Sequence, residues 1–544
     1  MMSVFRTCTR RFVLLLVFAG FAGGLAAAQP VPPMKQIAFT LVLAGGTVYD
    51  GLGGPPVVAD VGFVGDHIGA VGDLSDKKAA LRLDVRGLAV VPGFIDIHSH
   101  ASGTTPETSG LFARPLAENY LRQGVTTVFG GQDGSSPLPL GPYLDRLEAA
   151  RAAINFGAFV GHGTIRAAVV GEEDRAPTDE ELARMETMVE RAMEDGAFGL
   201  SSGLEYTPGA FATTEELIAL ARVAGRHGGL YISHVRDEGG RLLESVAEVI
   251  RVGEEAGLPA QVTHHKVIGK HRWGRSAESL RLIDEARARG VDVSSDQYPY
   301  TASSTGLTIL FPAWSKDGGT EALLARLADP DTRARIKADL VKHLDEERGG
   351  DPATVVAANC PWDASLNGKS LADLLTDRGL PVTLENAADV AMELQEKGGC
   401  QGVFHSMSEE DVRRIMRHPY TMISSDGGIP DPGVGVPHPR NYGAFARVLA
   451  RYVREERVLT FEEAVRKMTS LPAWRLGLTD RGVLRAGAFA DVTVLDPAAV
   501  ADHATFTDPH QYATGVVYVF VNGRVVFRND APTGLRPGRV LRHR

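Results

Sequence analysis

Cysteine is scarce in this 544-residue chain, which has only three, and this scarcity excludes a small scaffold held together by many disulfides. Cys8 lies near the start, whereas Cys360 and Cys400 lie in the second half. Two interpretations of the later pair stay open. They form a disulfide, which an oxidising compartment permits, or they are two buried free thiols.

Positive charge is also in short supply. Lysine and arginine number 57 against 67 acidic residues, so the formal net charge is −10, and no run of basic residues stands out. Nucleic acid and anionic membrane surfaces are therefore not expected as partners. The 44% apolar and 23% charged residues are close to the average for soluble globular proteins, which allows a large buried core and argues against global disorder.

The apolar run FVLLLVFAGFAGGL lies near the start and is short for a membrane span. Arg6, Arg10 and Arg11 precede it, and Ala26, Ala27 and Ala28 follow it. This order of cationic, apolar and small residues is typical of a cleaved export signal, which we assign to residues 1–28. The mature chain is expected to be periplasmic or secreted, without stable membrane insertion, and an uncleaved anchor is the alternative.

The rest of the chain shows two kinds of sequence pattern, one at both ends and another between them. Residues 36–92 and 484–544 hold short alternating apolar runs separated by Gly-Asp and Gly-Gly turns, which predicts one small composite β domain formed from both chain ends. Between them, over residues 93–483, eight short apolar runs alternate with helix-period segments. This alternation predicts an α/β fold, and eight parallel strands are what a closed (β/α)₈ TIM-like barrel needs. Residues from about 311 to about 396 fit this strand–helix alternation poorly and are expected to form an inserted lobe.

Several of the eight apolar runs end in histidine or aspartate. In GFIDIHSH, His98 and His100 are two residues apart and should share one face of the strand. The other strand-terminal candidates are His234, His264, His265 and Asp426. Neighbours on a strand point to opposite faces, so only one of His264 and His265 should reach a common site. These side chains are expected to meet at the C-terminal mouth of the barrel, where barrel enzymes have their active sites.

Imidazoles that converge at one site can chelate a divalent metal. Such a metal lowers the pKa of bound water and polarises a scissile carbonyl. A nearby carboxylate must take a proton from the water and return it to the leaving amine, and Asp426 is the candidate for that role. For a single aspartate after a strand, a turn or helix cap is the alternative role.

At these residues the sequence resembles the N-acyl-D-amino-acid deacylases (D-aminoacylases) of the amidohydrolase superfamily. The resemblance extends from VLAGGTVYDG to LRPGRVLRHR and includes PGFIDIHSH, GAFGLSSGLEYTPG, YISHVRDEG, THHKVIGKHRWGR, DQYPYTAS, SSDG and HPRNYG. It implies a β/α barrel with a small composite β domain. It also implies zinc-dependent hydrolysis of a small-molecule substrate, the amide of an N-acyl-D-amino acid, and leaves the oligomeric state open.

The resemblance implies roles for individual residues. His98 and His100 match the histidines of a weaker metal site, and His234 and His264 match ligands of a tight one. Asp426 matches the catalytic aspartate. The positions that match the substrate pocket are Lys266, Tyr298, Ser304 and Arg440. Arg440 matches the residue that pairs with the substrate α-carboxylate, and a planar guanidinium is well suited to bind a carboxylate. The alternative role for Arg440 is a structural ion pair.

One position departs from the family pattern. The family run GVTTVVxGNCG places a cysteine ligand after the second barrel strand, whereas this chain has GVTTVFGGQDG with Asp133 in that place. A carboxylate can ligate or bridge zinc, but it is a harder ligand than a thiolate. We therefore predict that Asp133 remains a metal ligand, with the number and identity of the metals left open.

Two other functions remain as alternatives. The first is a dipeptidase or cyclic-amide hydrolase of the same superfamily, whose members tend to use a lysine carboxylate as the bridging ligand. No lysine stands at a matching strand end, and Lys266 follows the histidine pair instead. The second is an inactive barrel that serves as a scaffold. Such a barrel would have no physical need of several buried, unpaired imidazoles.

Overall fold

A computed structural model describes residues 38–103 and 110–544, and residues 38–544 form one compact unit. The predicted export signal lies outside the described residues. No helix in the described part of the chain combines the length and the apolar composition of a membrane span.

All eight predicted runs form strands, and together they close a barrel. The strands are β6 (Phe94–Asp96), β7 (Val125–Gly130), β8 (Asn155–Ala158) with β9 (Val160–Gly161), β10 (Gly199–Gly203), β11 (Leu230–His234), β12 (Ala260–Val262), β13 (Val293–Gln297) and β18 (Thr421–Ile423). They pair in parallel in the orders β6-β7-β8 and β9-β10-β11-β12-β13-β18. All residues of these strands are buried, as expected for a parallel sheet that is covered on both faces.

Two contacts join these sheets into a ring. Strands β8 and β9 are separated by Phe159 alone, whose N–H donates to the carbonyl of Gly130 at 3.0 Å. On the other side, Ser99 forms a parallel bridge with Gly427, and the N–H of Asp426 donates to the carbonyl of His98 at 2.9 Å. The predicted TIM-like barrel is therefore confirmed.

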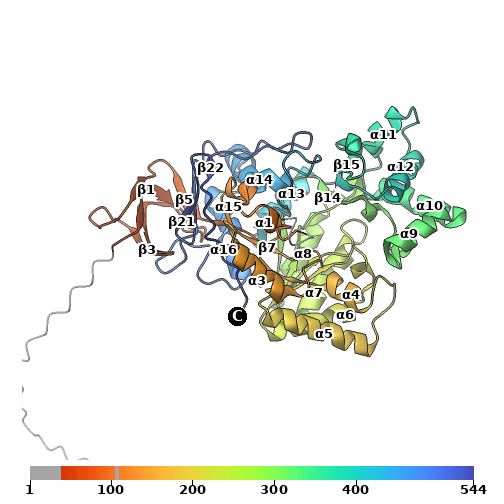
Figure 1. The fold of residues 1–544 in the computed structure, drawn as a ribbon, viewed down its shortest axis with the longest axis horizontal. Helices are drawn as coiled ribbons and strands as arrows, with labels where there is room; N and C mark the ends of the chain where they lie inside the picture. The colour runs from red at the N-terminus through yellow and green to blue at the C-terminus, as the bar shows by residue number, and fades with distance from the viewer. Residues whose placement is uncertain (1–37, 104–109) are drawn as a thin grey trace, which may run out of the picture. The chain divides into compact units, whose positions relative to one another are not determined.

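Helices follow the strands and cover the barrel (Figure 1). They are α1 (Gly110–Ala113), α2 (Glu118–Leu121), α3 (Leu140–Ala150), α4 (His162–Val169), α5 (Asp179–Glu194), α6 (Thr214–Arg226), α7 (Leu242–Ala256), α8 (Ser276–Ala288), α13 (Glu409–Arg417), α14 (Arg440–Arg447), α15 (Phe461–Met468) and α16 (Ser470–Arg475). Helix α5 shows why such segments are helical. Thr178 and Glu181 form a capping box at its start, and its buried face includes Met185 and Val189, four residues apart.

The two chain ends share one nine-stranded sheet (Figure 1). Its strands are β1 (Leu41–Val48), β2 (Val57–Val64), β3 (His67–Gly72), β4 (Arg82–Asp84), β5 (Ala89–Pro92), β19 (Val492–Leu495), β20 (Val516–Val521), β21 (Arg524–Arg528) and β22 (Ala531–Pro532). The join is the antiparallel pair β5–β19, in which Val492 faces Pro92 and Leu495 faces Ala89. The two β segments thus form one sheet, while the exact domain limits stay a prediction.

A second, smaller sheet interrupts the barrel between β13 and β18. It has the order β14-β17-β15-β16, and helices α9 to α12, drawn in green to teal in Figure 1, accompany it. The elements are β14 (Ser303–Gly306), α9 (Gly319–Ala328), α10 (Pro330–Glu346), β15 (Val355–Asn359), β16 (Lys369–Ser370), α11 (Leu371–Asp377), α12 (Leu384–Glu396) and β17 (Gln401–Phe404). We call this segment the inserted lobe. Cys360 and Cys400 form a disulfide between the end of β15 and the start of β17, which decides between the two interpretations of the pair.

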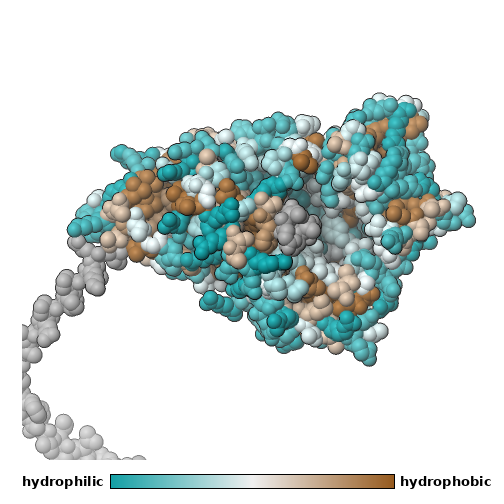
Figure 2. Space-filling model, viewed as in Figure 1, coloured by the Kyte–Doolittle hydropathy of each residue, from teal (hydrophilic) through white to brown (hydrophobic). Residues whose placement is uncertain are grey.

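The visible surface is mostly hydrophilic, with apolar residues in separate patches (Figure 2). Val58 and Trp474 are among the exposed large apolar side chains of the described residues.

Candidate metal centre and active site

The predicted site residues lie at the carboxyl ends of barrel strands. His98 and His100 follow β6, Asp133 follows β7, and His234 ends β11. His264 follows β12, and Asp426 follows β18. Because the strands are parallel, these ends share one mouth of the barrel, and the side chains are brought together there.

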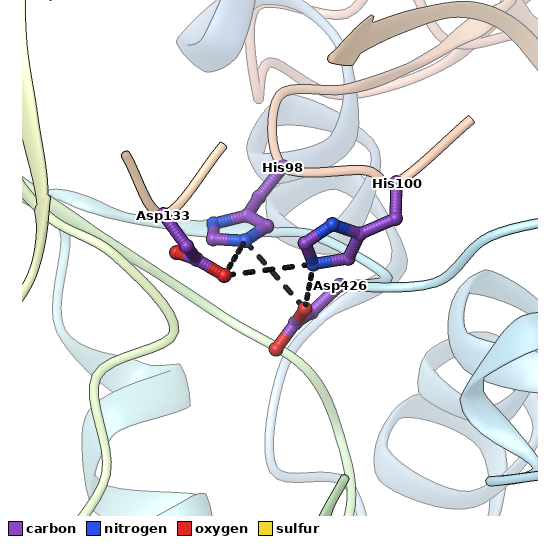
Figure 3. Close-up of side chains that lie close together, drawn as sticks. All are labelled: His98, His100, Asp133 and Asp426. Atoms are coloured by element: carbon purple, nitrogen blue, oxygen red, sulfur yellow. Dashed lines mark hydrogen bonds and ion pairs between the residues drawn. The ribbon is translucent and has the colours of Figure 1, made fainter. Parts of the chain in front are cut away.

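The first ligand group contains His98, His100, Asp133 and Asp426 (Figure 3). His98 Nε2 lies 3.5 Å from Asp133 Oδ2 and 3.5 Å from Asp426 Oδ1. His100 Nε2 lies 3.5 Å from Asp133 Oδ2 and 3.0 Å from Asp426 Oδ1. The four ligand atoms lie within 4.8 Å of one another, which is close enough to hold one metal ion.

The second ligand group contains Asp133, His234 and His264. Asp133 Oδ1 lies 3.4 Å from His264 Nε2 and 4.0 Å from His234 Nδ1. Asp133 therefore belongs to both groups and turns one oxygen toward each. A carboxylate placed in this way can bridge two metal ions.

The residues of the two groups fit a divalent metal. Four buried atoms at the centre have no hydrogen-bond partner: His98 Nδ1, His98 Nε2, Asp133 Oδ1 and His234 Nδ1. Buried polar atoms without partners cost free energy, and a metal ion would satisfy the atoms that face the centre. Imidazole nitrogens and carboxylate oxygens are also ligands that zinc and similar divalent ions accept.

Backbone strain accompanies this arrangement. Asp133, His264 and Asp426 have φ values of 52°, 35° and 49°, in the left-handed region that non-glycine residues rarely adopt. Such conformations cost on the order of 1 to 3 kcal/mol each and persist where the surrounding structure enforces them. Three strained residues in one site indicate that these side chains are held at fixed positions.

His264, and not His265, reaches the centre. His265 is buried among other residues, and its Nε2 lies 2.8 Å from Ser279 Oγ. Burial lowers the pKa of His265 to about 3, so it stays neutral. The rule of alternating strand faces predicts that only one of the two histidines reaches the site. Its reason does not apply here, because β12 ends at Val262 and both histidines lie beyond the strand.

The predicted substrate-binding residues line the same cavity, whose volume is about 400 Å³. Arg440 Nη1 lies 2.8 Å from Asp426 Oδ2, and Nη2 donates to the carbonyl of Ser304 at 3.1 Å. Lys266 Nζ lies 2.6 Å from His264 Nδ1 and also contacts Glu238. The Tyr298 ring lies 4.9 Å from the Arg440 guanidinium and 5.4 Å from Lys266 Nζ.

The charges around Asp426 favour its carboxylate form. Burial alone would raise the pKa of Asp426, but the Arg440 guanidinium and the neighbouring imidazoles outweigh burial and hold this pKa well below its usual range. Asp426 Oδ1 faces His100 and Oδ2 faces Arg440, so both oxygens are oriented.

Sequence reasoning missed several carboxylates beside the ligands. Asp296 Oδ1 accepts hydrogen bonds from Ser424 Oγ at 2.7 Å and from the N–H of His264 at 3.0 Å, and it lies 3.7 Å from His98 Nδ1. Glu205 and Glu238 line the cavity. These residues lie in the motifs DQYPYTAS, GLEYTPG and RDEG, which was the only signal that could have found them.

A closed α/β barrel with two such ligand groups at its C-terminal mouth defines the class of metal-dependent barrel hydrolases. Residues 83–527 match the amidohydrolase family, and the chain belongs to this family. It is 41% identical over 526 residues to the D-aminoacylase of Alcaligenes xylosoxydans xylosoxydans, an alignment that covers 92% of this chain and 97% of that protein.

Solved structures agree with this assignment. A D-aminoacylase with a binuclear metal centre is 37% identical, with a TM-score of 0.78, and the match covers 93% of this chain and all of the other. An N-acyl-D-glutamate deacylase from Bordetella bronchiseptica, solved with zinc and a phosphonate inhibitor, is 35% identical with a TM-score of 0.78 and the same coverage. The resemblance found in the sequence motifs is therefore confirmed.

Proposed function

We propose that this protein hydrolyses the amide bond of N-acyl-D-amino acids, giving a carboxylate and a free D-amino acid. The observation that carries the proposal is a single cavity lined by residues of both ligand groups, among them Asp133 and Asp426, with Arg440 beside Asp426. The names and functions of the D-aminoacylase and N-acyl-D-glutamate deacylase relatives support the substrate class.

The proposed cofactor is zinc, supported by the zinc-containing relative. The tight site would consist of Asp133, His234 and His264, and a second, weaker site would add His98 and His100 on the other side of Asp133. A bound zinc ion supplies an acidified water and a polarised carbonyl at neutral pH. The protein residues transfer the proton and orient the substrate.

Asp426 is proposed as the proton carrier. Its Oδ1 takes a proton from the attacking water and returns it to the amide nitrogen as the C–N bond breaks. Overall, one water adds across the bond, so the acyl carbon leaves as a carboxylate and the nitrogen as an amine. The Arg440 contact keeps Asp426 ionised and oriented for the first transfer.

Substrate orientation is assigned to the polar residues of the cavity. A guanidinium has five N–H donors, so Arg440 can keep its contacts to Asp426 and Ser304 and still pair with an α-carboxylate. Lys266 and Tyr298 lie beside it and would complete the carboxylate pocket.

A panel of N-acetyl-D- and N-acetyl-L-amino acids, assayed on the zinc-loaded mature protein, tests the proposal. We expect amine release from D substrates, loss of this activity with a chelator, and recovery on addition of zinc. A clear L preference would overturn the stereochemical part. Release only from dipeptides or cyclic amides would favour the alternative hydrolases, and no metal with no turnover would favour a scaffold.

We also propose that the protein is exported. The leader pattern and the Cys360–Cys400 disulfide, which suits an oxidising compartment, support this location. Cell fractionation of the full-length chain should recover the protein outside the cytoplasm without residues 1–28. Recovery of the full-length chain in the cytoplasm would contradict it.

A further inference from the structure

A chain of polar contacts connects the inserted lobe to His234. Arg348 follows α10 in the lobe, and its Nη2 donates to Glu205 Oε1 at 3.2 Å. Glu205 follows β10 of the barrel, and its Oε2 lies 2.9 Å from His234 Nε2. All three residues line the cavity, and the side chains of Arg348 and His234 are only 3% and 5% exposed.

The contact with Glu205 decides which nitrogen of His234 can bind a metal. A carboxylate accepts hydrogen bonds, so it selects the form of the ring that carries its proton on Nε2. The lone pair then lies on Nδ1, the buried nitrogen that has no hydrogen-bond partner and faces Asp133 Oδ1 at 4.0 Å. Glu205 therefore orients His234 for the ligand group that it shares with Asp133 and His264.

Arg348 is itself held in place. Its Nε lies 3.2 Å from His343 Nε2 of α10, and its guanidinium stacks over the Phe404 ring of β17 at 4.9 Å. Its position therefore depends on the packing of two lobe elements. The guanidinium also argues against a separate cation site at the neighbouring group of Glu205, His343 and Glu347, because its positive charge lies among these ligands.

We infer that Glu205 and Arg348 are positioning residues for the metal centre, so that the inserted lobe takes part in holding His234 ready to bind metal. This inference rests on the metal centre of the proposed function. Carboxylates that orient metal-binding histidines contribute about 10- to 100-fold to metal affinity in other metal sites.

Zinc affinity, measured by competition with a chromophoric chelator, tests the inference without any substrate. Arg348→Met and Glu205→Gln should each lower the affinity of the tighter site about 10- to 100-fold. Arg348→Lys, which retains the positive charge, should recover part of the loss. The visible spectrum of the cobalt-loaded protein should change in both damaging variants, because the orientation of a ligand changes.

Two matched controls separate this role from general stability. Arg333→Met removes another arginine–glutamate pair of the lobe, with Glu396, and Glu190→Gln removes another glutamate–histidine pair, with His227 at 2.8 Å. Both should leave zinc affinity and the cobalt spectrum unchanged. If Arg348→Met does not fold, the zinc affinity of Glu205→Gln decides whether the positioning role holds.

The outcomes distinguish the two proposals. Wild-type protein that binds no zinc would contradict the metal centre itself. Wild-type protein that binds zinc, with the same affinity and cobalt spectrum in Arg348→Met and Glu205→Gln, would overturn only the positioning role.

Discussion

At the scale of single residues, Asp133 is the feature that sets this site apart. It stands where the resemblance to the D-aminoacylases implies a cysteine, and its two oxygens face different ligand groups. A thiolate has one ligand atom, whereas a carboxylate has two separated oxygens, so aspartate can span the groups at some cost in zinc affinity. On the proposed metal centre, the substitution would therefore change how the two groups are joined while keeping a side chain that can bind metal.

Asp133→Ala should lower both metal content and turnover. Because partners outside the ligand set already contribute about 10- to 100-fold, removal of a ligand shared by both groups should cost at least about 100-fold in affinity. Elemental analysis after dialysis against a weak chelator measures this effect. Asp133→Cys is the matched control and should retain metal, and wild-type metal content in Asp133→Ala would refute the ligand role.

Arg440→Met should weaken recognition of the α-carboxylate. Removing one partner of a buried charge pair costs about 2 to 5 kcal/mol, so kcat/KM for an N-acyl-amino acid should fall about 30-fold or more. Loss of the Asp426 contact affects every substrate, so the α-carboxamide analogue provides the internal control. An equal loss of kcat/KM for the acid and the carboxamide would show that Arg440 does not recognise the carboxylate.

At the scale of elements, close approach between strand ends shapes the metal centre. Gly203 is the last residue of β10, and a Cβ there would lie 2.1 Å from the carbonyl oxygen of Asp133 and 3.0 Å from the Tyr206 ring. Only glycine lets the loop after β7 and the end of β10 meet at this distance. The contact falls on Asp133, whose backbone has a left-handed φ of 52°.

Gly203→Ala should therefore displace Asp133. Overpacking of this kind costs about 1 to 3 kcal/mol, so thermal unfolding should begin at a lower temperature and metal content should fall. Gly54→Ala is the control, since a Cβ at Gly54 meets nothing within 4 Å. Unchanged metal content in a folded Gly203→Ala protein would contradict the argument.

At the scale of the whole molecule, the inserted lobe is built into the active site. Its strand β14 carries Ser304, which lines the cavity, and the N–H of Leu307 just beyond this strand donates to the carbonyl of Cys400 at 2.8 Å. The disulfide therefore adjoins the part of the lobe that lines the cavity. Stability of the lobe and integrity of the cavity should change together.

Replacing Cys360 and Cys400 with serine should destabilise the lobe. The bridge closes a loop of 40 residues, for which chain entropy gives about 4 kcal/mol. Tryptophan fluorescence should report unfolding at a lower denaturant concentration, because two of the four tryptophans, Trp314 and Trp362, lie in the lobe. Wild-type protein treated with a reductant should behave like the variant, and coincident unfolding curves for the oxidised and reduced protein would contradict the prediction.

The sequence by itself determined the architecture of this protein and the chemistry of its strand ends. Strands that are buried on both faces are short apolar runs, so the barrel strands could be predicted from the sequence. The turn-rich segments at the two chain ends have the alternating pattern of a separate β-sheet, so the composite sheet could be predicted as well. The residue types of the candidate site could also be predicted, because His98, His100, His234 and Asp426 end short apolar runs.

Only the tertiary structure decided how these residues meet. It brought His264, which the family resemblance favours over His265, to the centre through a left-handed turn, set Asp133 between two ligand groups, and joined Cys360 to Cys400. It also brought Arg348 of the lobe to Glu205, 143 residues away in sequence. Distances between residues remote in the chain follow from packing, and local sequence patterns carry no information about them.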